Sequence, residues 1–190
     1  MYKIVNFSFF LFLIIFISGG SMSAEKEFIN IKLKDGEVKI ELRSDLAPKH
    51  VERIKKLVSE KKYDNVVFHR VIEGFMAQTG DVQYGNAKNS EYNLSRVGTG
   101  GSEYKDLPSE FSNEKHLRGA VSMARAQDPN SANSQFFICF ADCTILDGQY
   151  TIWGQVVNGM DFVDNIKKGK GSNGQVENPD RILKMSLIQE

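Results

Sequence analysis

Apolar and polar residues alternate along several short stretches of the chain, as they do in strands that bury one face. The first two stretches lie at residues 27–34 and 38–43, with Asp35-Gly36 between them. Asp-Gly is preferred in a tight type I′ turn, so this part of the chain predicts a β-hairpin. The same reasoning predicts further strands at residues 66–72, 75–80, 119–125, 135–140, 150–157 and 181–189.

Two stretches have helical spacing instead. Pro48 suits the first position of a helix, and apolar residues then recur three and four apart as far as Val58. A shorter helix is predicted from Met160 to Ile166. About eight short strands with one early and one late helix, and no internal repeat, favour a mainly β fold: a closed eight-stranded antiparallel β-barrel capped by two α-helices.

The alternation also assigns side chains to faces. In the strand at 66–72, Phe68, Arg70 and Ile72 share one side and His69 lies on the other, so His69 and Arg70 should not face the same groove. Residues 82–101 are polar and rich in Gly, Asn and Ser, and they predict a long surface loop. Its Gly98–Gly101 segment lacks the strand, lysine and helix of a phosphate loop and is expected to form a turn.

Composition narrows the function. The 190 residues include 24 basic and 24 acidic side chains, so no net charge favours nucleic acid as a partner. Residues 25–190 have the size of one domain.

Cys139 and Cys143 have no nearby histidines and predict no zinc site; we expect packing thiols, with Cys139 partly exposed beside Phe137. His50 and His116 are expected at the surface.

Residues 1–24 have the three-part pattern of a secretory signal. A lysine precedes an apolar run that is short for a membrane span, and small residues follow it before Glu25. We expect a cleaved signal peptide and an exported protein. An uncleaved N-terminal anchor that holds the domain at the inner membrane is the alternative.

The chemistry-bearing residues gather in two stretches. One stretch holds a single guanidinium group, that of Arg70, followed by Phe75, Met76 and the neutral amide of Gln78. The other places Gln135 and Phe137 on one face of a strand. Neither brings an obvious nucleophile or paired carboxylates, so the pattern favours a site that binds and polarises a neutral group.

Three ordered segments carry a resemblance to a known family. They are FHRVIEGFMAQTGD, then SEFSNE with RGAVSMARAQDPNSANSQFFICF, and LDGQYTIWGQVVNGMDFVDNI. Together they resemble the cyclophilin family of peptidyl-prolyl cis–trans isomerases over residues 27–190, and the form of the last two segments is similar to bacterial members. The resemblance implies the eight-stranded barrel with two helices and, with the signal pattern, a location in the bacterial periplasm.

The resemblance also implies the roles of individual residues. Arg70 falls on the catalytic arginine, and Gln78 falls on the amide that contacts the substrate backbone. The remaining substrate-binding positions implied are Phe75, Met76 and Phe137 in the proline pocket, Leu146 at its rim, Ala124 and Gln135 along the groove, and Tyr150 at the pocket edge. The implied partners are proline-containing segments of folding proteins, bound by a monomer that needs no cofactor.

Two positions depart from the best-known eukaryotic pattern. Ile145 stands where a tryptophan often does, so the resemblance implies weakened binding of cyclosporin. Tyr150 stands where a histidine often does, and it keeps an aromatic ring with a polar tip. A groove that binds proline-containing segments without catalysis, as a chaperone or assembly module, is the alternative function.

Overall fold

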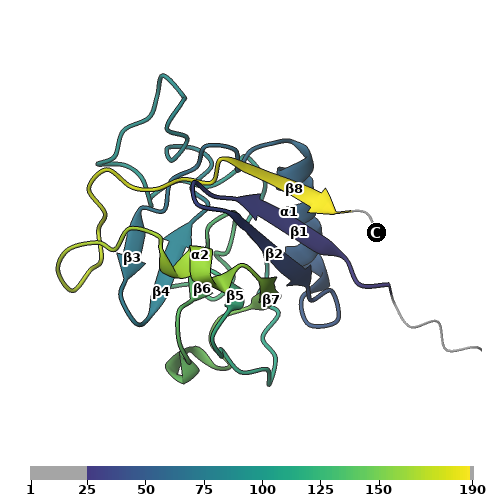
Figure 1. Ribbon diagram of the computed structural model, residues 1–190. Coiled ribbons are helices and arrows are strands. Elements are labelled where there is room, and N and C mark those ends of the chain that lie inside the picture. The colour runs from purple at the N-terminus through teal and green to yellow at the C-terminus, as the bar shows by residue number, and fades with distance from the viewer. Residues whose placement is uncertain (1–24, 189–190) are drawn as a thin grey trace, which may run out of the picture.

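Eight strands form one antiparallel sheet in the computed structural model, which describes residues 25–188 (Figure 1). The strands are β1 (Phe28–Lys32), β2 (Glu37–Leu42), β3 (Arg70–Ile72), β4 (Met76–Thr79), β5 (Ala120–Met123), β6 (Phe136–Cys139), β7 (Ile152–Asn158) and β8 (Lys184–Ile188). The helices are α1 (Pro48–Ser59) and α2 (Met160–Asp164), with a short 3₁₀ helix, η1 (Thr144–Leu146). The expected signal segment at residues 1–24 lies outside the described residues.

The sheet is strongly curled, and its two edges are β3 and β8. The eight strands lie in the order β3-β4-β6-β5-β7-β2-β1-β8, so β3 and β8 do not pair with each other. The chain before each edge strand bridges the gap: Val67 pairs with Arg181, and Phe68 N–H donates to the Asp180 carbonyl at 2.8 Å. The prediction of eight antiparallel strands and two helices is confirmed. The prediction also had the barrel closed, whereas the named strands form a curled sheet in which β3 and β8 are not hydrogen-bonded to each other.

The hairpin of β1 and β2 is confirmed, but its turn differs from the prediction. Leu33 N–H donates to the Gly36 carbonyl at 2.8 Å, so Lys34 and Asp35 are the central residues of the turn. A type I′ turn requires positive φ at both central residues, which the prediction took to be Asp35 and Gly36. Neither residue has a positive φ, so that prediction was wrong. A Cβ on Gly36 would approach the ring of Phe162 to 2.4 Å, and this glycine therefore makes room for α2.

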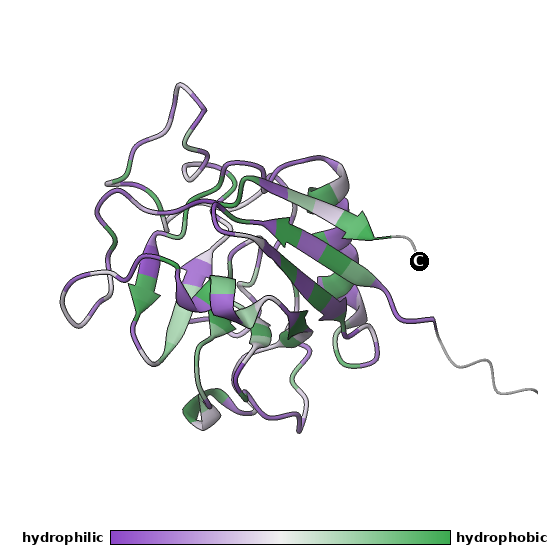
Figure 2. Ribbon diagram, in the orientation of Figure 1, coloured by the Kyte–Doolittle hydropathy of each residue, from purple (hydrophilic) through white to green (hydrophobic). Residues whose placement is uncertain are grey.

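The predicted alternation places one face of the sheet in the core. In β1 and β2 the apolar residues are buried and the charged ones face outward, which Figure 2 shows as alternating green and purple bands. Helix α1 covers this core from the side of β7 and β8. Ile54 and Leu57 of α1 are fully buried, and burying each such side chain contributes about 2 kcal/mol.

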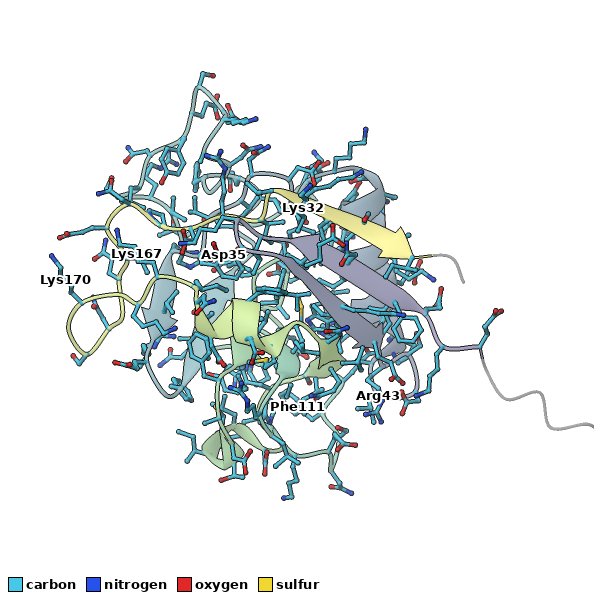
Figure 3. The ribbon with its side chains drawn as sticks, viewed as in Figure 1. Lys32, Asp35, Arg43, Phe111, Lys167 and Lys170 are labelled. Atoms are coloured by element: carbon cyan, nitrogen blue, oxygen red, sulfur yellow. The ribbon has the colours of Figure 1, made fainter. Side chains whose placement is uncertain are left out.

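Long loops surround the face that carries the candidate site. Residues 82–101 follow β4 and project at the top of Figure 1. The connection from α2 to β8 carries Lys167 and Lys170, at the left of Figure 3, and Phe111 lies on the lower loop. Within residues 25–188, no helix combines the length and apolarity needed to cross a bilayer.

Candidate active site

Strand register brings the predicted site residues into one row. Arg70 of β3 lies opposite Gln78 of β4, and Gln78 lies opposite Phe137 of β6. Phe137 in turn lies opposite Ser122 of β5. Paired residues on adjacent strands share a face, so the cation, the amide and the ring stand side by side. The sequence shows the residues but not this pairing, which depends on the order of the strands.

A cavity of about 180 Å³ opens beside this row. It is lined by eight of the nine predicted site residues together with one that was not predicted: Arg70, Phe75, Met76, Gln78, Ala124, Phe137, Leu146 and Tyr150, with Arg125. Gln135 is absent from its wall. The cavity is small enough to hold one pyrrolidine ring and has the apolar walls that such a ring needs.

The Arg70 guanidinium is fixed at the edge of the cavity. Its Nε donates to the Asn173 carbonyl at 3.0 Å, and its Nη1 donates to Gln78 Oε1 at 3.2 Å. Met76 Sδ lies 3.9 Å from the same Nη1. Partial burial lowers the pKa of Arg70 below its ordinary value, and Tyr150 opposes this effect. Arginine stays protonated all the same, so the site holds a partly desolvated cation whose hydrogen bonds are strong.

The floor of the cavity is aromatic and buried. The rings of Phe137 and Tyr150 meet edge to face, with centroids 5.8 Å apart. Behind Phe137, the imidazole of His116 lies nearly parallel, with centroids 6.3 Å apart and an interplanar angle of 19°. Phe137 is therefore packed on both sides, and this packing restricts the rotamer of the ring that forms the floor of the pocket.

Arg125 is the residue that the sequence did not reveal. Its guanidinium lies 4.6 Å from the centroid of the Tyr150 ring and donates to the Gln149 carbonyl from Nε and Nη2 at 3.2 and 3.0 Å. These contacts hold Tyr150 against the cavity. The residue follows directly after Ala124, but no periodicity indicates that its side chain folds back over the ring.

Gln135 lies next to the cavity rather than in it. Its Oε1 accepts from Gln78 Nε2 at 3.0 Å. It lines a second cavity of about 350 Å³, which shares Gln78, Ala124 and Arg125 with the first. Gln135 thus lies next to the residues predicted for the proline pocket, and its role along the groove stays a prediction.

The three histidines lie differently from the expectation. His50 and His116 are each 0% exposed, so the prediction that they lie at the surface was wrong. Each is buried because a carboxylate from a distant loop pairs with it, which a sequence pattern cannot show. His69 does not line the cavity of 180 Å³, but it lines a third cavity of about 320 Å³ together with Arg70. The prediction that these two side chains do not face the same groove was therefore wrong, because His69 precedes β3 and strand alternation does not separate it from Arg70.

The two cysteines are buried free thiols. Cys139 is 0% exposed, so the expected partial exposure was wrong: its side chain packs in a cluster with Met76 and Phe137 beneath the cavity. Burial raises the pKa of both thiols. Within residues 25–188, no three histidine, cysteine or acidic side chains gather as metal ligands.

Comparison with known proteins adds an independent line of support. Residues 28–187 match the family model described as cyclophilin type peptidyl-prolyl cis-trans isomerase/CLD. A probable peptidyl-prolyl cis-trans isomerase of Brucella suis biovar 1 is 58% identical over 172 residues, which cover 90% of this chain and 87% of the relative. A peptidyl-prolyl cis-trans isomerase of Helicobacter pylori strain J99 is 36% identical over 150 residues, 77% of this chain and 84% of that protein.

Solved structures agree with the sequence relatives. A crystal structure of a Cryptosporidium parvum cyclophilin type peptidyl-prolyl cis-trans isomerase matches with a TM-score of 0.72 and 26% identity, over 87% of this chain and 99% of that one. A second crystal structure of that protein, in the presence of the dipeptide Ala-Pro, matches with a TM-score of 0.71 over 86% of this chain and 99% of that one. This chain therefore belongs to the cyclophilin-type peptidyl-prolyl cis–trans isomerase family and is an isomerase of X–Pro peptide bonds.

Proposed function

We propose that the isomerase site is the 180 Å³ cavity beside Arg70 and that its substrates are X–Pro bonds of exported proteins. One observation carries the assignment of the site. A partly desolvated guanidinium, held by Gln78 and the Asn173 carbonyl, stands at the mouth of an apolar cavity whose floor is Phe137. The location of the substrates rests on the signal pattern of residues 1–24.

Arg70 supplies the catalytic interaction. Amide resonance sets a rotation barrier of about 18–20 kcal/mol, because the proline nitrogen shares its lone pair with the carbonyl. In the twisted transition state the lone pair returns to the nitrogen and can accept a hydrogen bond. The described residues give Arg70 Nη2 no partner, so its N–H groups are available to donate to that nitrogen. The bond forms only in the transition state, which is the requirement for an increase in kcat.

The remaining site residues hold the substrate while one half of it turns. Phe75, Met76, Phe137 and Leu146 grip the proline ring, and Tyr150 closes the edge of the pocket. Gln78 and the backbone at Ala124 hold the flanking chain, which then passes Gln135 in the neighbouring cavity. The rotation breaks no covalent bond and moves no proton, so these side chains suffice without a cofactor.

A direct test replaces the cation. We expect Arg70→Ala to lower kcat about 100-fold in a protease-free prolyl-peptide assay, with KM changed less than about threefold, because the lost interaction belongs to the transition state. Arg43→Ala is the matched control: Arg43 is also a partly buried arginine, but it pairs with Asp45 at the end of β2 (Figure 3). Its kcat should equal that of the wild type.

The same assay separates catalysis from simple binding. If the wild type gives only background turnover while proline peptides still bind, the chain is a binding module and the assignment of Arg70 is wrong. Equal losses in kcat and in peptide affinity on Arg70→Ala would also contradict a role confined to the transition state.

Three further expectations are part of the proposal. Export with removal of residues 1–24 predicts an intact mass that lacks them in protein from the native host, and retention of the segment would indicate the inner-membrane anchor.

Ile145, which is 75% exposed beside the cavity, offers no indole N–H, so calorimetry should show weak cyclosporin binding. A single species at monomer mass in light scattering would support a monomer.

We also propose that the barrel closes through the chain outside its strands. Phe68 N–H donates to Asp180 O at 2.8 Å, and Ile182 N–H donates to Val66 O at 2.9 Å. Closure predicts slow amide exchange at Phe68 and Ile182, as slow as within β1, whereas an open edge predicts fast exchange at both.

A further inference from the structure

A buried carboxylate organises the polar loop that follows β4. Asp81 is 0% exposed, and four backbone N–H groups converge on its two oxygens. Gln83 and Tyr84 donate to Oδ1 at 3.1 and 2.9 Å, and Gly98 and Gly100 donate to Oδ2 at 2.8 and 2.9 Å. The loop of residues 82–101 is thus tied at both of its ends to one side chain.

The two glycines fit this arrangement for stereochemical reasons. Gly98 has φ +97°, a conformation that side-chain-bearing residues rarely adopt. A Cβ on Gly100 would lie 2.6 Å from Asp81 Oδ1. The Gly98–Gly101 segment, which the sequence indicates only as a turn, is therefore shaped to bring two backbone N–H groups onto the carboxylate.

The carbonyls of the same two glycines point to the active site. Gln135 Nε2 donates to Gly98 O at 3.1 Å and to Gly100 O at 2.8 Å. Gln135 Oε1 accepts from Gln78 Nε2 at 3.0 Å, and Gln78 Oε1 accepts from Arg70 Nη1 at 3.2 Å. Hydrogen bonds therefore lead from Arg70 to the carbonyls of Gly98 and Gly100, and the backbone of these two glycines completes the series to Asp81.

The chemistry at the two ends sets the direction of every bond between them. A guanidinium only donates, so Gln78 must present its oxygen to Arg70 and its NH₂ group to Gln135. Backbone carbonyls only accept, so Gln135 must present its NH₂ group to Gly98 and Gly100. Aligned hydrogen bonds polarise one another, and those from Arg70 through Gln78 and Gln135 all run toward the carbonyls of the two glycines whose N–H groups donate to Asp81.

We propose that Asp81 is a positioning residue for prolyl isomerisation. By fixing the carbonyls of Gly98 and Gly100, it orients the amides of Gln135 and Gln78 and so holds the Arg70 guanidinium at the mouth of the cavity. Asp81 touches no substrate, and its effect passes entirely through the intervening groups. The inference rests on the proposed catalytic role of Arg70.

The kinetic test is a double-mutant cycle. Asp81→Asn keeps the size of the side chain but replaces an accepting oxygen with a donor that faces backbone N–H groups. We expect kcat to fall about tenfold with KM nearly unchanged, because Arg70 shifts while the apolar pocket does not. In a Gln135→Met background, where the series is already interrupted, Asp81→Asn should lower kcat by less than about twofold.

The control lies in the same loop. Asn93 Oδ1 accepts from Ser95 N–H at 3.0 Å and does not contact the series. Asn93→Ala should leave kcat and KM unchanged. If Asp81→Asn lowers kcat equally in the wild type and in the Gln135→Met background, Asp81 acts only on global structure and the inference is wrong.

Two measures guard against a failure of folding or of the proposed function. Gly98→Ala leaves Asp81 intact but strains the carbonyl to which Gln135 Nε2 donates. It should lower kcat as Asp81→Asn does, and in the Gln135→Met background it should have little effect on kcat. Side-chain amide signals of Gln78 and Gln135 in ¹⁵N NMR, with the Arg70 Nε–H signal, should shift in both variants and not in Asn93→Ala. The NMR result does not depend on turnover: unshifted signals overturn the inference even if the isomerase assignment is correct.

Discussion

His50 and His116 are held in nearly the same way, yet they serve different parts of the molecule. In each, Nδ1 and the backbone N–H contact one carboxylate oxygen, from Glu110 in the first case and Asp147 in the second. The Nδ1 contacts are 2.6 and 3.1 Å, and the backbone bonds are 3.0 and 2.9 Å. Burial lowers the pKa of both imidazoles, while the carboxylates oppose this shift.

The first pair stabilises the start of a helix. Ala47, the N-cap of α1, has no side chain to accept hydrogen bonds from the first turn. Glu110, from the loop before β5, replaces it: its Oε1 accepts from Lys49 N–H at 3.2 Å, and its Oε2 accepts from His50 N–H. The other ring nitrogen of His50, Nε2, is buried and has no hydrogen-bond partner among residues 25–188.

The second pair supports the active site instead. His116 Nε2 lies 3.1 Å from Ser122 Oγ, and the flat ring packs behind Phe137. The sequence of contacts from Ser122 through His116 to Asp147 resembles a nucleophilic triad, but Ser122 is 0% exposed and no substrate can reach it. The same local arrangement therefore takes its role from what the far side of the imidazole touches.

The acid dependence of stability should come mainly from His69, because no carboxylate within residues 25–188 hydrogen-bonds to its ring. Burial lowers the pKa of His69 to about 4, and the described part of the chain offers its Nδ1 no hydrogen-bond partner. The unfolded chain binds a proton near pH 6.5, so between pH 6.5 and 4 acid favours unfolding. Above pH 6.5 both states are neutral and the effect disappears. The gap between the two pKa values corresponds to about 3 kcal/mol of unfolding free energy.

Urea unfolding at a series of pH values measures this loss, with Trp153 as the reporter since it is buried and is the only tryptophan. His69→Gln should remove most of the slope between pH 6.5 and 4. A slope unchanged in His69→Gln would mean that the acid dependence comes from other groups whose native pKa is lowered, such as His50 and His116, and not from His69.

The next effect concerns the helix cap alone. Glu110→Ala removes the acceptor for two backbone N–H groups and for His50 Nδ1, so we expect the free energy of unfolding to fall by about 2 kcal/mol with kcat unchanged. Glu114→Ala is the control, because Glu114 is exposed in the same loop and its carboxylate pairs with Arg43 at 3.5 Å rather than with the helix. A loss of activity in Glu110→Ala would remove the distinction between the two pairs.

The parts of the fold that periodicity describes were predictable. The alternation of Ile29 and Ile31 with charged neighbours indicates β1, and Pro48 with Leu57 and Val58 indicates α1. Strand ends were less predictable: β3 begins at Arg70 rather than at residue 66, because the preceding residues pair with Asn86 and Arg181 across loops. Such long-range pairing leaves no local pattern.

The site divides in the same way. Arg70, Gln78 and Phe137 could be proposed from sequence, and the register places them side by side. Arg125 and the His116–Asp147 pair could not, because their contacts depend on how loops fold back onto strands. The prediction that Asp81 matters also needs the structure, since its partners Gly98 and Gly100 lie 17 and 19 residues away.

Removing only the negative charge of each carboxylate should have a small effect that differs between the two pairs. Asp147→Asn and Glu110→Gln make the same chemical change at the two pairs, because each keeps the shape of the side chain and removes its charge. Each should lower the free energy of unfolding by about 1 kcal/mol, since one oxygen can still accept the backbone N–H. Only Asp147→Asn should also lower kcat/KM, by about threefold, because His116 then supports Phe137 less firmly. Equal activities in the two variants, with both folded at the assay temperature, would show that the stacking of His116 on Phe137 contributes nothing to isomerisation.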